Sequence, residues 1–64
     1  MNLRELTKHL QNIKTLREET IERLGSERPG TFYAKFLRRK RARLEVQIGK
    51  ARRLIQELTR DQHD

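Results

Sequence analysis

Leucine and isoleucine recur every three or four positions in the first part of the chain. At 100° per residue these apolar positions form one stripe about 140° wide on a helix. Asn2 and Glu5 fit the two ends of a capping box at its start. The pattern therefore predicts an amphipathic helix over residues 3–24. The stripe consists of Leu3, Leu6, Leu10, Ile13, Leu16, Ile21 and Leu24.

A second stripe of the same period predicts a longer helix over residues 32–60. Thr31 is a plausible N-cap for this helix. Asp61 and Asp64 would face the negative end of the helix dipole, so we expect residues 61–64 to fray. No alternating apolar pattern predicts a strand. The stripe consists of Tyr33, Phe36, Leu37, Leu44, Ile48, Ala51, Leu54, Ile55 and Leu58.

Residues 25–31 are expected to form the connecting turn. Gly25 suits the left-handed position that follows the last residue of a helix. Pro29 disfavours helical geometry at Arg28, so the helix break is well marked. The predicted fold class is all-α, an antiparallel two-helix hairpin that forms a single domain over residues 1–64.

Two helices cover only one side of each stripe, and exposed leucines at this density are costly. Because the second helix is longer, we expect Ile55 and Leu58 to extend past the first. We expect a homodimer that completes a four-helix bundle, and a larger protein partner is the alternative. The candidate interface residues are Leu6, Leu10, Ile13, Leu44, Ile48, Leu54, Ile55 and Leu58.

The positive charge is concentrated in the second helix. The 64 residues include 16 Lys and Arg against 9 Asp and Glu, for a formal net charge of +7. Residues 1–24 hold five basic and four acidic side chains, whereas residues 25–64 hold eleven and five. Between residues 35 and 53, nine basic side chains accompany one acid, Glu45. This imbalance predicts a polyanionic partner.

The basic side chains of the second helix are candidate phosphate contacts. Most of them point away from the apolar stripe and form a ridge about 25–30 Å long. Such a ridge can meet several phosphates of a duplex, and arginine suits bidentate phosphate contact. The ridge predicts a small non-catalytic accessory or regulatory protein that binds DNA or RNA, although a merely solvated helix face has the same pattern. The candidate residues are Lys35, Arg38, Arg39, Arg43, Lys50, Arg52 and Arg53.

A small protein–protein adaptor or inhibitor is the alternative function. Its apolar stripe or basic face would then dock on a larger acidic protein. In size, charge and hairpin layout the chain resembles a family of small ribosomal proteins that bind ribosomal RNA. It is also similar to the short helical accessory proteins encoded by phages and plasmids, a class defined by size rather than by motif.

Three aromatic residues, Phe32, Tyr33 and Phe36, lie together beside the turn. Such a cluster closes the open end of a helical hairpin, or its rings stack on unpaired bases. We favour the closing role, with Tyr33 and Phe36 turned into the stripe and Phe32 as the exposed ring.

Two basic residues, Arg17 and Lys40, fall on the apolar stripes at the same level of the hairpin. Their long side chains can reach outward past an apolar wall. Alternatively, acidic side chains of a second copy neutralise them. We favour the outward placement. On the outer side of the second helix, Gly49 leaves room for close approach of a phosphate backbone or another helix, or is simply tolerated there.

Catalytic chemistry is not expected. The absence of cysteine excludes disulfides, a thiolate zinc site and a cysteine nucleophile. His9 and His63 are interpreted as surface residues, and no glycine-rich phosphate loop or serine motif is present. We therefore expect no catalytic residue, no metal, no cofactor and no small-molecule substrate. No apolar run resembles a membrane span or the core of a signal peptide, so we expect a cytoplasmic protein.

Overall fold

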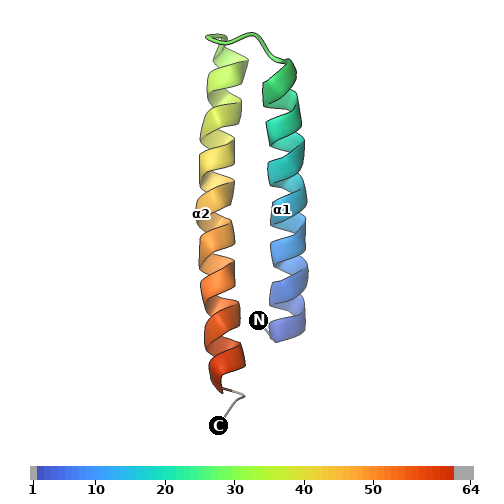
Figure 1. Ribbon diagram of the computed structural model, residues 1–64, viewed down its shortest axis with the longest axis vertical. Helices are drawn as coiled ribbons and strands as arrows, with labels where there is room; N and C mark the ends of the chain where they lie inside the picture. The colour runs from blue at the N-terminus through green and yellow to red at the C-terminus, as the bar shows by residue number, and fades with distance from the viewer. Residues whose placement is uncertain (1, 62–64) are drawn as a thin grey trace.

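The computed structural model describes residues 2–61 as two helices, α1 (Leu3–Ser26) and α2 (Phe32–Asp61), joined by a short turn. The helices run antiparallel and pack side by side along their lengths (Figure 1). The hairpin measures 51 × 15 × 15 Å. The predicted all-α hairpin is confirmed, and its helix bounds differ from the predicted ones by two residues or fewer. Beyond Asp61, the predicted frayed tail lies outside the described residues.

Both predicted N-caps are present. At the start of α1, the Glu5 backbone N–H donates to Asn2 Oδ1 at 2.8 Å. At the start of α2, the Ala34 backbone N–H donates to Thr31 Oγ1 at 3.0 Å. Each cap satisfies a backbone donor that has no partner inside its own helix. These two polar side chains therefore fix where the helices begin.

The prediction that Gly25 ends α1 in a left-handed conformation was wrong. The helix continues through Gly25 to Ser26, and its C-cap is Glu27 in an extended conformation, with φ −90° and ψ 149°. Gly30 has the positive φ instead, at 91°. The reversal of chain direction is thus placed after Pro29, which cannot continue a helix, and only there does the backbone need the freedom of glycine.

The core lies between the N-terminal half of α1 and the C-terminal two-thirds of α2, where six apolar side chains are buried against one another. These residues are Leu6, Leu10, Ile13, Leu44, Ile48 and Ala51. Ile55 and Leu58 pack against this cluster and are partly buried. Although α2 extends beyond the start of α1 (Figure 1), these two residues therefore still cover the core, which differs from the sequence-based expectation.

Near the turn, the two helices meet through Thr20, Ala34 and Leu37 rather than through the aromatic rings. Ala34, Leu37 and Thr20 are almost fully buried, whereas Tyr33 is 40% and Phe36 is 51% exposed. The prediction that the aromatic rings close this end was therefore wrong, because the line of α2 that faces α1 passes through Ala34 and Leu37. Tyr33 and Phe36 each precede one of these residues in the sequence, and the rotation of 100° per residue places their rings to one side of that line. The predicted exposure of Phe32, at 90%, is confirmed.

Thr20 is a polar residue that the apolar pattern did not identify as part of the core. Its hydroxyl donates to the Leu16 carbonyl one turn earlier at 2.7 Å. Because that bond satisfies the hydroxyl within its own helix, the side chain can be buried without an unpaired polar group.

Candidate nucleic-acid interface

All seven predicted phosphate-contact residues lie on α2, and all are exposed. The helix is continuous from Lys35 to Arg53, so these side chains are held over about 27 Å of a rigid element. At 100° per residue, Lys35, Arg39 and Arg53 point almost directly away from α1. Arg38 and Arg52 lie on one flank of this line, and Arg43 and Lys50 lie toward the other. The structure therefore brings the seven together as a broad basic surface rather than as one narrow ridge.

Other basic residues are drawn toward the contact between the helices. Lys40, Arg41 and Arg17 are half-buried, and the Arg17 Nε is buried without a hydrogen-bond partner among the described residues. Half-burial of this kind is typical of long side chains at the edge of a core, although the buried Arg17 Nε is not turned outward as predicted. By contrast, Lys35 is exposed on the outer side of α2, and its Nζ lies 5.9 Å from the centre of the exposed Phe32 ring, within the range of a cation–π interaction.

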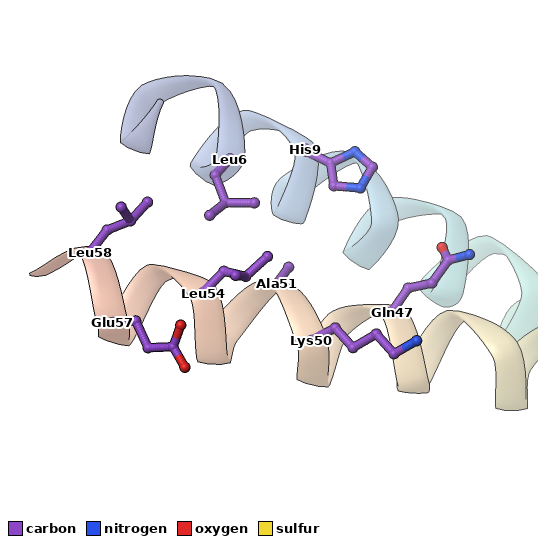
Figure 2. Close-up of a pocket in the computed structure, with 8 residues that line it drawn as sticks. All are labelled: Leu6, His9, Gln47, Lys50, Ala51, Leu54, Glu57 and Leu58. Atoms are coloured by element: carbon purple, nitrogen blue, oxygen red, sulfur yellow. The ribbon is translucent and has the colours of Figure 1, made fainter. Parts of the chain in front are cut away.

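One side of the hairpin is hollowed at both ends. The larger hollow, of about 640 Å³, lies near the start of α1 (Figure 2). Its apolar lining comes from Leu6, Ala51, Leu54 and Leu58, and its polar lining comes from His9, Gln47, Lys50 and Glu57. A smaller hollow of about 220 Å³ lies near the turn, between Thr20 and Arg23 on α1 and Tyr33 and Phe36 on α2.

The two hollows belong to the same side because their lining residues come from matching flanks of the two helices. We call this side the hollowed face and define it by four exposed apolar residues: Leu16, Tyr33, Phe36 and Leu54. Each is between 40% and 51% exposed. Exposed apolar residues at this density on one side of a small protein are typical of an interaction surface.

The aromatic pair at the turn end of the hollowed face is held in place by contacts on both helices. The Tyr33 and Phe36 rings stack, with centroids 6.3 Å apart and planes at 22°. The Arg23 guanidinium of α1 donates to the Tyr33 hydroxyl oxygen at 3.1 Å. This hydrogen bond is the main reason why the pKa of Arg23 is raised above its usual value. The antiparallel register of the hairpin places Arg23 and Tyr33 at the same level, so a contact between these two residues could be predicted from the sequence.

The predicted partner-interface residues have unequal positions in the structure. Leu6, Leu10, Ile13, Leu44 and Ile48 are buried within the hairpin itself, and Ile55 and Leu58 are half-buried. Leu54, at 50% exposure, is the member of this set that a partner would meet directly. Participation of all eight in an interface between molecules stays a prediction.

Within residues 2–61, no three histidine or acidic side chains come together as a possible metal site. His9 is exposed at the rim of the larger hollow, while His63 lies outside the described residues. Neither α1 nor α2, over the part of the chain described, has an apolar stretch long enough to cross a membrane.

Comparison with known proteins gives no family assignment. No protein-family model, curated protein or solved structure matches the chain. The charge on α2 and the shape of the hollowed face are therefore the features of the molecule that bear on its function.

Proposed function

We propose that this is a small, non-catalytic nucleic-acid-binding protein with an accessory or regulatory role, which contacts phosphates through the basic side of α2. The observation that supports this proposal is the exposure of seven basic side chains on one continuous helix, with Glu45 the only acid between residues 35 and 53. A rigid helix of this charge can follow a phosphate backbone without rearrangement. Its guanidinium groups can bind phosphate oxygens in pairs.

The affinity in this proposal comes mainly from release of the counterions that surround the nucleic acid. The logarithm of the binding constant then falls with the logarithm of the salt concentration, with a slope of about −0.9 per neutralised phosphate of a DNA duplex. Four contacts along α2 would weaken binding roughly a hundredfold between 50 and 200 mM salt. Phosphate contacts position a protein without reading bases, so DNA and RNA duplexes are both expected to bind.

We further propose that the protein acts in the cytoplasm as a homodimer built as a four-helix bundle. A dimer carries the basic side of α2 twice, which raises the number of phosphates that one particle can contact. The exposed apolar residues of the hollowed face support this part of the proposal, since a second copy would cover them.

The test is duplex binding measured by fluorescence anisotropy across a salt series, with two double variants of equal charge. Arg39→Glu with Arg53→Glu changes the outer side of α2. Arg4→Glu with Lys8→Glu changes exposed positions on α1. Both variants lower the formal charge from +7 by four, so they differ only in where the charge is lost.

The α2 variant is expected to lose most of its affinity, with a salt slope shallower by about 1.8 for two lost phosphate contacts. The α1 variant is expected to lose much less. Equal losses in the two variants would show attraction by net charge without a site on α2, and absence of binding at 50 mM salt would refute the proposal outright. Far-UV circular dichroism serves as the control that both variants remain helical.

A further inference from the structure

The hairpin exposes more surface than a compact protein of its mass. Its accessible area is 5546 Å² for 7.8 kDa. A compact monomer of this mass exposes about 4400 Å², so the excess is about 1100 Å². Each partner in a stable complex contributes about 800 Å² to the interface. The excess is therefore large enough to supply one full interface.

Charge opposes an interface less at the hollows than on the other sides of α2, because the basic residues Arg23, Lys40 and Lys50 that line the hollows are accompanied there by Glu19 and Glu57. The outer side of α2 carries Lys35, Arg39 and Arg53, and the flank opposite the hollowed face carries Arg38 and Arg52. Four exposed apolar side chains lie instead on the hollowed face, with the larger hollow at one end. Burial of these four side chains together is favourable, whereas the other exposed apolar side chains, Ile21, Phe32 and Val46, are spread over other sides of the hairpin.

A second copy of the chain can cover the hollowed face in two ways that keep neighbouring helices antiparallel. In one, each helix lies over its own counterpart and the two turns are at opposite ends. In the other, α1 of each copy lies over α2 of its partner, and both turns are at the same end. The two arrangements differ in which charges meet.

Charge distinguishes the two arrangements. Residues 25–64 hold eleven basic side chains against five acidic, whereas residues 1–24 are almost balanced. Placing α2 over α2 brings the two most basic helices together, with Lys40 near the partner subunit's Lys50. Placing α1 over α2 instead brings Glu19 near the level of the partner subunit's Lys40. Opposite charges then meet at the rim, which favours this register.

We propose that the hollowed face is the self-association surface, and that two copies pair with α1 of each over α2 of the other. Leu54, which lines the larger hollow with Leu6 and His9 (Figure 2), then lies over the partner's α1 at the level of those two residues. The two larger hollows of the pair would therefore close over each other. At the other end, the Tyr33–Phe36 pair covers the groove beside Thr20. The pairing rests on the homodimer of the proposed function and is independent of nucleic-acid binding.

The chain lacks cysteine, so a single introduced cysteine places a spin label without ambiguity. Arg28→Cys puts the label in the exposed turn. In the proposed pairing, the distance between the two labels is at most about two hairpin thicknesses of 15 Å, apart from the label arms. With the turns at opposite ends, the distance approaches the 51 Å length of the hairpin. A long distance, or absence of dipolar coupling at high protein concentration, overturns the proposal.

A second measurement tests the surface itself. Leu54→Glu places a charge on the hollowed face, and Val46→Glu places the same charge on the outer side of α2 at a similarly exposed position. By analytical ultracentrifugation, Leu54→Glu is expected to weaken dimerisation roughly a hundredfold, because a leucine is lost from the interface twice. Val46→Glu is expected to leave it almost unchanged, and equal effects of the two changes would overturn the proposal.

The two proposals fail in different ways. Leu54→Glu leaves every basic residue of α2 in place, so the monomeric variant is still expected to bind a duplex, with about the same salt slope as the dimer, because each α2 of the proposed pair contacts its own duplex. A wild-type chain that binds a duplex as a monomer contradicts the pairing and leaves the nucleic-acid proposal intact. A wild-type dimer with the short label distance that binds no duplex supports the pairing and contradicts the nucleic-acid proposal.

Discussion

The end of α1 offers a test in which the sequence pattern and the structure predict opposite signs. Gly25 is helical in the structure, and a Cβ added there would meet no atom within 4 Å. Gly25→Ala therefore creates no clash, and it removes conformational freedom from the unfolded chain. If Gly25 were left-handed, as its position after Leu24 suggested, the added Cβ would instead meet the following carbonyl oxygen. The structure thus predicts stabilisation, and the sequence pattern predicts destabilisation.

The size of the effect follows from the position of Gly25 in the final turn of α1. Alanine is favoured over glycine by about 0.8–1.0 kcal/mol in a helix interior, and we expect about half of this at a helix end. A gain of about 0.5 kcal/mol raises the Tm of a domain of this size by about 2–4 °C. A left-handed Gly25 would make the same substitution cost about 1–2 kcal/mol and lower the Tm by more than 4 °C.

Thermal unfolding followed by far-UV circular dichroism measures this difference, with Gly30→Ala as the matched control. Gly30 has φ 91° and also has open space around an added Cβ, so its substitution isolates backbone strain and should lower the Tm. All three proteins are compared at one concentration, because self-association makes Tm depend on concentration. A Tm that falls as far in Gly25→Ala as in Gly30→Ala would refute the helical assignment of Gly25.

The remaining predictions concern the packing near the turn, the second N-cap and the shape of the proposed complex. Leu37→Ala is expected to cost about 2–5 kcal/mol in urea unfolding, since Leu37 is buried, whereas truncation of the exposed ring in Phe32→Ala should cost almost nothing. Thr31→Ala removes the cap on the Ala34 N–H and should cost about 1 kcal/mol by the same measurement. In the proposed dimer the two α2 helices lie diagonally opposite, with their outer sides facing away from each other. Light scattering with excess short duplex should therefore give the mass of two duplexes per dimer, and a plateau at one would contradict that placement.

The hairpin could be predicted from the sequence because its determinants are local and repeated. Apolar residues at helical spacing, polar caps at Asn2 and Thr31 and the break at Pro29 all act within a few residues of where they stand. The predictions that were wrong concern positions whose burial is set by contact between the two helices. Thr20 is buried because its hydroxyl is satisfied inside α1, and Ala34 excludes the rings of Tyr33 and Phe36 because it faces α1 directly. Neither effect can be deduced from the spacing of apolar residues in the sequence.

The candidate site could be predicted only in its composition. Charge in a sequence shows how many phosphates a helix can neutralise, and the identification of α2 as the basic element needed nothing more. The direction of each charge depends on which line of α2 faces α1, and that line is set by Leu37, Leu44 and Ile48. It is this rotation that places Leu54 beside a hollow rather than in the core, and that separates an apolar side of the molecule from a basic one. In the proposed pairing, association through the hollowed face leaves the outer side of α2, with Lys35, Arg39 and Arg53, exposed to an anion.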